Sequence, residues 1–398
     1  MYKQRLLLKN FVPGANGLLS AQFGSNAPNS LKIENALVVS KLSHFDFEKH
    51  RYKDLNEHEL EHKIRNRGTD YDKLKYYHNL HKNFENNVVD TLKNMGIAVK
   101  VVNRFNYSED SIHWADIIVP TGGDGTFLLA ASKIRDNKKL VVGFNSDPNR
   151  SEGHLCLPKK YSTNIREAIE KLQCGDFKWL LRSRIRTTLI GQRGTKVMPK
   201  NLHECNDKDD MKFIPTKLEE CGRVLPYLAL NEVFIGESLS ARVSHLSMWL
   251  NGFDRETNMK CSGVCICTGT GSTSWNLSIN RLPIQSVAEL LRLLDIDATE
   301  GKDSLATVLA RMYNDNLTFA ADDKKMCYTI RDLISAGVWP QPKGIKSRGF
   351  ASKVKVKSNC FDACLVIDGG VSFEFNDGTI AILEINPDDA LRTVTFSD

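Results

Sequence analysis

One stretch organises the rest of the chain: Ala115-Asp-Ile-Ile-Val-Pro-Thr-Gly-Gly-Asp-Gly-Thr-Phe-Leu-Leu-Ala-Ala-Ser132. Its apolar, β-branched residues 117–119 predict a strand that ends at Pro120, and the residues from Thr126 onward favour a helix. Three glycines lie between the two elements: Gly122, Gly123 and Gly125. A strand that turns through glycines into a helix N-terminus is suited to bind phosphate, because the backbone is accessible and the helix dipole attracts anions.

A single carboxylate, Asp124, stands among these glycines. Its charge repels the anion that the loop attracts, so the residue needs a chemical reason to be there. We therefore predict that Asp124 is a general base. The structural alternative is a tight turn in which Asp124 is the N-cap of the following helix.

The composition is that of an ordinary globular protein of two or three domains, with 398 residues of which 41% are hydrophobic and 26% charged. No apolar run approaches ~18 residues, the length that a membrane-spanning helix needs, so we expect no membrane partner. The net charge is +6, but residues 1–33 contain basic and no acidic side chains, which leaves the remainder almost neutral. We therefore expect no nucleic-acid partner.

The acid-free segment 1–33 is also amphipathic, with leucines and phenylalanines between its basic residues and serines. This pattern is typical of a mitochondrial targeting segment and predicts a protein of the mitochondrial matrix. A cytoplasmic protein with a disordered basic N-terminus is the alternative. The ten cysteines have no C-x-x-C spacing, which indicates buried free thiols in a reducing compartment.

The pattern of the chain changes near Gly175. Residues 34–176 alternate strands, predicted at 36–39, 97–102, 117–119 and 140–144, with helices, which indicates a doubly wound α/β domain. Residues 177–386 contain many short alternating apolar runs, which indicate a β-rich, β-sandwich-like domain with insertions at 192–222 and 284–325.

Two further segments of this second half offer ligand-binding groups. Asn231-Glu232 lies at the edge of an apolar strand, where an amide and a carboxylate together could recognise a sugar diol or an adenine edge. Thr268-Gly-Thr-Gly-Ser-Thr-Ser-Trp275 repeats the strand–glycine–helix design and adds hydroxyls and one aromatic ring suited to a nucleotide.

Two other patterns favour a structural explanation. His58-Glu-Leu-Glu-His62 matches the H-E-x-x-H zinc motif, but its charged neighbours indicate an exposed helix, so we predict no metal site there. The basic stretch Lys343–Lys357 alternates at its end with valines, which indicates a solvated strand face. Attraction of a triphosphate is its functional alternative.

These motifs, together and in this order, resemble the NAD kinase family, particularly its mitochondrial branch. The residues that carry the resemblance are Gly122-Gly-Asp-Gly-Thr126, Gly153-His-Leu155, Asn231-Glu232, Gly271-Ser-Thr273 and Asp368-Gly369. The first motif alone is shared with diacylglycerol and sphingosine kinases, and the others distinguish the families. One departure is an insertion: residues 146–152 stand where the family pattern has a single residue.

The resemblance implies an ATP-dependent phosphotransferase that converts NAD to NADP by phosphorylating the adenosine-ribose 2′-hydroxyl, with Asp124 as base. It implies that the tail 387–398 returns to the N-terminal domain. We expect Mg²⁺ to arrive with ATP, and a homodimer or other homo-oligomer. The implied NAD contacts are Gly125, Asn231, Glu232, Thr273, Trp275 and Ser278; the donor-phosphate contacts are Gly122, Gly123 and Thr126; and Asp368 is a second carboxylate near the site.

Two other functions remain open from the residues alone. A lipid or sphingoid-base kinase would use the same glycine loop but needs an apolar slot for an acyl chain. A non-catalytic NAD-binding module would bind the nucleotide without releasing ADP.

Overall fold

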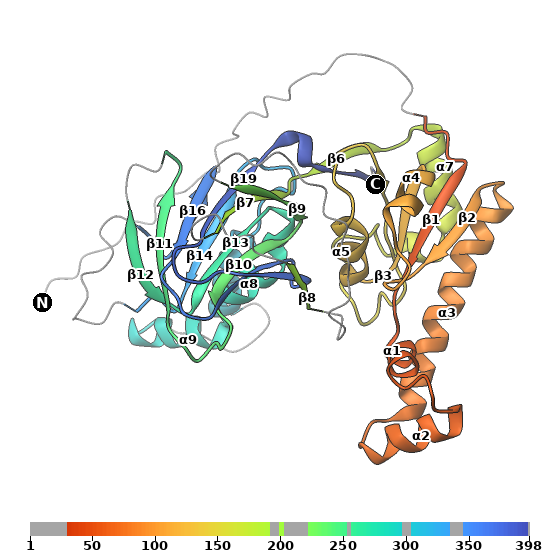
Figure 1. The fold of residues 1–398 in the computed structure, drawn as a ribbon, viewed down its shortest axis with the longest axis horizontal. Coiled ribbons are helices and arrows are strands. Elements are labelled where there is room, and N and C mark those ends of the chain that lie inside the picture. The colour runs from red at the N-terminus through yellow and green to blue at the C-terminus, as the bar shows by residue number, and fades with distance from the viewer. Residues whose placement is uncertain are drawn as a thin grey trace, which may run out of the picture.

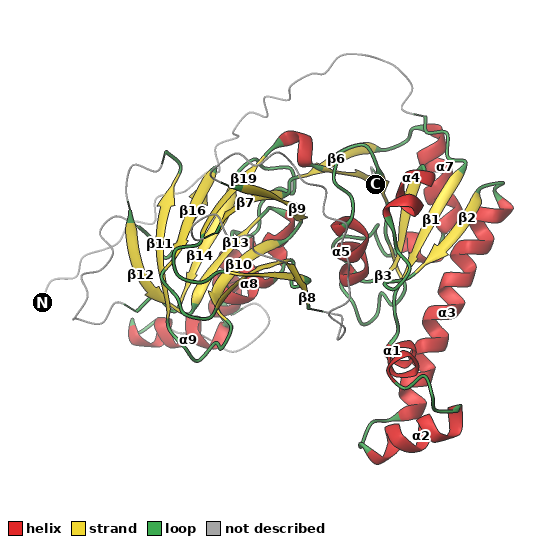
Figure 2. Ribbon diagram, viewed as in Figure 1, coloured by secondary structure: helices red, strands yellow, loops and turns green. Residues whose placement is uncertain are grey.

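Three β-sheets organise the part of the chain that the computed structural model describes, namely residues 30–191, 199–202, 222–252, 256–296, 304–334 and 345–396. Figure 1 and Figure 2 show one lobe that contains the first sheet and most of the helices, and a second lobe built mainly of strands. The expected targeting segment lies outside the described residues, except for residues 30–33.

The first sheet has the order β2-β1-β3-β4-β20-β6, and β5 pairs with the end of β3. The strands β2, β1, β3 and β4 are parallel, whereas β20 runs antiparallel to β6. The bounds are β1 (Asn35–Ser40), β2 (Ala98–Val102), β3 (Ile117–Gly122), β4 (Leu140–Val141), β5 (Phe144–Asn145), β6 (Lys178–Arg182) and β20 (Leu391–Thr395).

Helices cover both faces of this sheet. They are α1 (His44–Arg51), α2 (Glu57–Asn66), α3 (Tyr71–Asn94), α4 (Glu109–Trp114), α5 (Asp124–Ser132), α6 (Lys160–Thr163) and α7 (Ile165–Cys174). Because side chains alternate along a strand, Ile117 packs in one apolar cluster with α3 and α7, while Ile118 packs in another with α4 and α5. The predicted doubly wound α/β arrangement is confirmed. Figure 2 shows that α3 extends beyond the sheet and meets α1 and α2 there.

We expected from the sequence that Pro120 would end strand β3. That prediction is wrong, since β3 continues to Gly122. Opposite Pro120 the partner of β3 changes from β4, which ends at Val141, to β5, which begins at Phe144. A proline has no backbone N–H to donate. The position between β4 and β5 requires no N–H donor from β3, so the sheet accommodates Pro120 there.

The other two sheets pack face to face and form the predicted β-sandwich. Their orders are β15-β14-β13-β10-β17-β18-β8 and β12-β11-β16-β19-β7-β9. One apolar cluster joins them, with Val264 and Leu365 from the first of these sheets and Ile185 and Leu383 from the second. The bounds are β7 (Ile185–Ile190), β8 (Pro199–Asn201), β9 (Arg223–Ala229), β10 (Glu232–Glu237), β11 (Ser244–Leu250), β12 (Thr257–Cys261), β13 (Gly263–Cys267), β14 (Met326–Arg331), β15 (Arg348–Ala351), β16 (Lys353–Ser358), β17 (Ala363–Ile367), β18 (Val371–Glu374) and β19 (Ile380–Ile385).

Helices in the sandwich half accompany the second glycine loop and the later insertion. They are α8 (Trp275–Asn280), α9 (Ile284–Leu293), α10 (Leu305–Asp315) and the short 3₁₀ turn η2 (Thr270–Thr273). A second 3₁₀ turn, η3 (Pro387–Asp389), precedes β20. Most of the expected insertion 192–222 lies outside the described residues. No helix among the described residues is both long and apolar enough to cross a bilayer.

The segment from β6 to β7 belongs to two sheets and carries a buried arginine between them. Arg184 has no exposed surface, and its guanidinium donates to the carbonyl oxygens of Asp389, Ile134 and Asp136 at 2.5, 2.5 and 3.1 Å. It therefore binds the C-terminal side of α5 and the turn before β20 at once. The domain boundaries stay predictions, since β6 and β20 both lie in the first sheet.

Replacing Arg184 with Met should lower the free energy of unfolding by about 3 kcal/mol, because it leaves buried carbonyl oxygens without donors. Urea unfolding followed by tryptophan fluorescence measures this. The matched control is Arg166→Met, whose side chain is 53% exposed and makes only a surface ion pair with Glu170, so its effect should stay below about 1 kcal/mol. Equal losses in the two variants would contradict this role for Arg184.

Candidate functional site

The turn from β3 into α5 depends on contacts that only glycine allows. A Cβ on Gly122 would lie 2.3 Å from the Thr126 hydroxyl oxygen, and one on Gly123 would lie 2.9 Å from the Ser151 hydroxyl oxygen. Gly123 is the N-cap of α5, and no side chain caps the helix. The alternative in which Asp124 is the N-cap is therefore wrong, because Asp124 is the first residue of α5.

The carboxylate of Asp124 is held by a second segment of backbone. Its Oδ1 accepts the N–H of Leu155 at 2.9 Å, and its Oδ2 accepts the N–H of His154 at 3.2 Å. The turn that brings these groups in contains Gly153, with a φ of +65°, where a Cβ would lie 2.5 Å from the Asn145 side chain. Asp124 is thus fixed by neutral donors and forms no ion pair with any described residue, which leaves its charge available to a ligand.

Asp124 and the glycine loop line a cavity of about 600 Å³, with Gly125 on its open side. Two cationic side chains, Lys41 and Arg104, line it as well. The remaining lining is mixed: Leu42, His44, Phe47, Gly123, Thr126, Leu129, Asn145, Ser146, Asp147 and Ser151. A helix N-terminus beside two cations is suited to a polyphosphate, and the apolar side chains to a planar base.

The insertion 146–152 contributes to this cavity. Ser146, Asp147 and Ser151 line it, and the hydroxyl of Ser151 is the group closest to a Cβ added at Gly123. The segment that departs from the family pattern is therefore part of the cavity wall.

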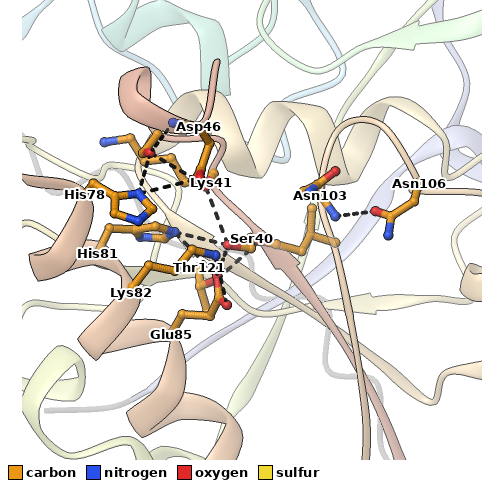
Figure 3. Close-up of polar contacts among 12 residues, drawn as sticks. Ser40, Lys41, Asp46, His78, His81, Lys82, Glu85, Asn103, Asn106 and Thr121 are labelled. Atoms are coloured by element: carbon orange, nitrogen blue, oxygen red, sulfur yellow. Dashed lines mark hydrogen bonds and ion pairs between the residues drawn. The ribbon is translucent and has the colours of Figure 1, made fainter. Parts of the chain in front are cut away.

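A buried polar network supports the cavity from behind, where β1 meets α3 (Figure 3). The hydroxyl of Ser40, the last residue of β1, contacts the Glu85 carboxylate and lies 3.1 Å from His81 Nε2. Burial lowers the pKa of His81 to about 4, so the ring is neutral at physiological pH. The network anchors α3 to the strand end that is followed directly by Lys41, whose N–H donates to the Thr121 carbonyl at 3.0 Å.

The second glycine loop packs directly on Asn231. A Cβ on Gly271 would lie 2.1 Å from the Asn231 carbonyl oxygen, and one on Gly269 would lie 1.7 Å from that of Ala320. The Thr268 hydroxyl donates to the Leu230 carbonyl at 2.5 Å. The predicted strand, loop and helix are present as β13, η2 and α8, so this loop and the Asn231-Glu232 pair form one unit.

Asp368 clamps the backbone at this pair. Its carboxylate accepts the N–H groups of Leu230, Asn231 and Glu232 at 2.7, 2.8 and 3.0 Å. Burial raises the pKa of Asp368 to about 6, and the three donors favour its ionised form at neutral pH. The second carboxylate predicted from the sequence therefore shapes the site through the backbone.

Glu232 and Asn231 each present a buried oxygen that no described residue binds. Burial, helped by the nearby Asp368 charge, raises the pKa of Glu232 to about 8, and its Oε2 is buried and without a partner. Asn231 donates from Nδ2 to the Ser274 hydroxyl at 3.0 Å, while its Oδ1 is buried and without a partner. Buried polar atoms of this kind indicate a place for a ligand.

Trp275 is the aromatic ring beside this pair. It is 36% exposed and packs at 4.7 Å between ring centroids on Phe234 of β10. The other two predicted contacts, Thr273 and Ser278, lie on η2 and α8, with hydroxyls that donate to the Thr270 and Ser274 carbonyls at 3.2 and 3.4 Å. The Arg331 guanidinium also lies over this ring, 5.5 Å from its centroid. A partly exposed ring with hydroxyls on the same two elements fits a nucleotide base.

The two loops share a hydrophobic cluster. Leu155, whose N–H binds Asp124, and Leu230, whose N–H binds Asp368, both lie in the cluster formed on the α5 side of the first sheet. The two carboxylates are therefore anchored on adjoining pieces of one core. Asn231 and Glu232 are outside the cavity lining.

The remaining sequence patterns have structural roles. Glu59 forms a capping box with Asn56 at the start of α2, and α2 buries Leu60 and Ile64, which the charged pattern of the motif did not indicate. Among the described residues no group of His, Cys, Asp or Glu side chains could hold a metal ion. Val354 and Val356 of β16 are buried, while the alternating lysines Lys353, Lys355 and Lys357 are only partly buried, as the strand interpretation predicts. Lys343 lies outside the described residues.

Sequence reasoning missed three basic residues near the site, namely Lys41, Arg104 and Arg182. Lys41 and Arg104 line the cavity, and Arg182 donates to the Thr270 hydroxyl at 3.3 Å and is attracted by the charge of Asp124. The available signal was that Lys41 directly follows a predicted strand, at the carboxyl edge of a parallel sheet.

Comparison with known proteins identifies the family, although no family model matches the chain. The human protein "NAD kinase 2, mitochondrial" is 40% identical over 388 residues, which cover 93% of this chain and 86% of the human one. The Xenopus tropicalis protein of the same name is 38% identical over 410 residues, covering 96% and 95%. The solved structure of an NAD kinase from Archaeoglobus fulgidus in complex with ATP covers 91% of this chain and 93% of its own, at 16% identity and a TM-score of 0.48.

Identity at this level over nearly the whole of both proteins does not arise by chance. The chain belongs to the NAD kinase family.

Proposed function

We propose that this protein is an NAD kinase that transfers the γ-phosphoryl group of ATP to the 2′-hydroxyl of the adenosine ribose of NAD. The observation that carries the proposal is the placement of Asp124. It is held by two backbone N–H groups at the edge of a cavity that also contains a helix N-terminus and two cations. The names of the curated relatives support the reaction, and they do not support the lipid-kinase alternative.

The donor is expected in the cavity, as ATP with its Mg²⁺. The backbone N–H groups at the start of α5, together with Lys41 and Arg104, suit its phosphates, and Gly122, Gly123 and Thr126 shape the loop around them. The absence of a multi-carboxylate cluster among the described residues fits an ion held mainly by the phosphates, with Asp147 as the further carboxylate of the lining.

The acceptor is expected on the other side of Asp124, against the second loop. Asn231 Oδ1 and Glu232 Oε2 would bind the nucleoside, and the partly exposed ring of Trp275 would contact its base. The 2′-hydroxyl oxygen then attacks the γ-phosphorus while its proton passes to Asp124. The bond between the γ-phosphorus and the bridging oxygen breaks, ADP leaves, and NADP is formed.

Two further properties concern location and assembly. The relatives named mitochondrial and the acid-free basic start of the chain together support import into the mitochondrial matrix. The homodimer or other homo-oligomer expected from the sequence stays a prediction.

Replacing Asp124 with Asn should lower kcat about 10²–10⁴-fold, because the amide accepts no proton. The dissociation constant of NAD should change little, since the amide keeps an acceptor for one of the two N–H groups that hold it. NADP formed from NAD, ATP and Mg²⁺ is measured with an NADP-specific dehydrogenase.

The matched control is Glu152→Gln, an identical change at an exposed carboxylate close to His154 but outside the cavity lining. It should retain the normal rate. An Asp124→Asn variant with near-normal kcat would exclude Asp124 as the base. Wild-type protein that binds NAD and ATP but forms neither ADP nor NADP would support the non-catalytic module instead.

Glu232 predicts a pH dependence of NAD binding. Because its pKa is raised to about 8, Glu232 is protonated below that pH and can donate to an acceptor of the nucleoside. As the pH rises through about 8 the proton is lost, so the affinity of the wild type for NAD should fall by about tenfold per pH unit above it.

Calorimetric titration of NAD below and above this pH tests the idea. A Glu232→Gln variant keeps a donor at every pH, so it should bind like the wild type near neutrality and show no loss at alkaline pH. A wild-type affinity that stays constant across the pKa, or a glutamine variant that loses binding already at neutral pH, would contradict the role of a protonated carboxyl.

A further inference from the structure

Arg182, the last residue of β6, lies between the two glycine loops. Its Nη1 donates to the hydroxyl of Thr270 at 3.3 Å, and Thr270 is the first residue of η2. On its other side the guanidinium is attracted by the carboxylate of Asp124 and lies near the thiol of Cys156, whose pKa burial raises to about 12. Arg182 is therefore a cation that is hydrogen-bonded to the second loop and attracted by the charge of the candidate base.

The hydrogen-bond partners of Arg182 differ from those of Arg184 and Arg186, the arginines two and four residues further along the chain. Arg184 donates to several backbone carbonyls, and Arg186 makes a two-pronged ion pair with Asp389 at 2.6 and 2.7 Å. Arg182 has one long hydrogen bond, its Nε is buried without a partner among the described residues, and it forms no direct ion pair with Asp124. Burial of this Nε without a partner is costly and is not explained by the fold alone.

The two groups that interact with Arg182 belong to the proposed donor site and the proposed acceptor site. Asp124 begins α5 and lines the cavity, whereas Thr270 belongs to the loop that packs through Gly271 on Asn231. Arg182 itself is outside the cavity lining. It can thus set the separation of the two loops without contacting the donor.

We propose that Arg182 is a positioning residue that ties the second glycine loop to Asp124, and so keeps the acceptor hydroxyl within reach of the base. This inference rests on the proposed function. Phosphoryl transfer depends mainly on alignment, and a displacement of about 1 Å can cost about 10²-fold in rate.

The test compares Arg182→Met, Arg182→Lys, Thr270→Val and the Met–Val double variant by kcat, by KM for each substrate and by melting temperature. Arg182→Met should lower kcat about 10²-fold and leave KM for ATP unchanged, because the cavity lining is intact. Arg182→Lys should recover part of the loss, since it retains the charge. Thr270→Val should cost less than Arg182→Met, and the double variant should be no slower than Arg182→Met, because both changes break the same contact.

The matched control is Arg186→Met. Arg186 lies four residues after Arg182, and its side chain forms an ion pair with Asp389 outside the site. It should lower the melting temperature without lowering the kcat of the folded protein. An Arg182→Met variant with the kcat of the wild type, or losses that multiply in the double variant, would overturn the proposal.

Wild-type protein in the same assay separates this inference from the function on which it rests. If the wild type forms no NADP, the proposed function fails. If the wild type forms NADP and Arg182→Met forms it equally fast, only the role of Arg182 fails.

Discussion

The fully buried guanidinium of Arg184 is the constraint on which the arrangement of the two halves depends. It lies where the chain passes from the first sheet to the β-sandwich, and it holds the C-terminal side of α5 and the turn before β20 through backbone carbonyls. If this guanidinium moved, its N–H groups would lose the carbonyl oxygens that accept from them. These hydrogen bonds therefore favour a single packing of the two halves. The N-terminus of α5, with Asp124, is thereby fixed relative to the sandwich that carries Asn231.

The site uses its three carboxyl groups in different roles. Asp124 and Asp368 are each held by backbone N–H groups, two in one case and three in the other. Glu232 lies beside Asp368, and the charge of that neighbour adds to burial in raising the pKa of Glu232 to about 8. One group can therefore accept a proton, one organises backbone, and one can donate a hydrogen bond. A similar division by environment separates acid from base in many active sites.

The local parts of this site could be predicted from the sequence, whereas the long-range parts could not. The strand, glycine turn and helix at 115–132 follow from short-range pattern, and Asp124 was identified there. Lys41 and Arg182 were missed because basic residues are frequent, and their proximity to the site arises only from the three-dimensional fold. The end of β3 was predicted wrongly at Pro120. The strand can include this proline because its pairing partner changes there from β4 to β5, which lie elsewhere in the sequence.

The most direct test of the account is an experimental structure of the protein with NAD and a non-hydrolysable ATP analogue. We predict that the 2′-hydroxyl of the adenosine ribose lies within hydrogen-bond distance of Asp124. The terminal phosphate of the analogue should lie over the turn Gly122–Thr126, in the cavity that Lys41 lines. A complex in which the 2′-hydroxyl points away from Asp124, or in which the analogue binds outside this cavity, would contradict the account.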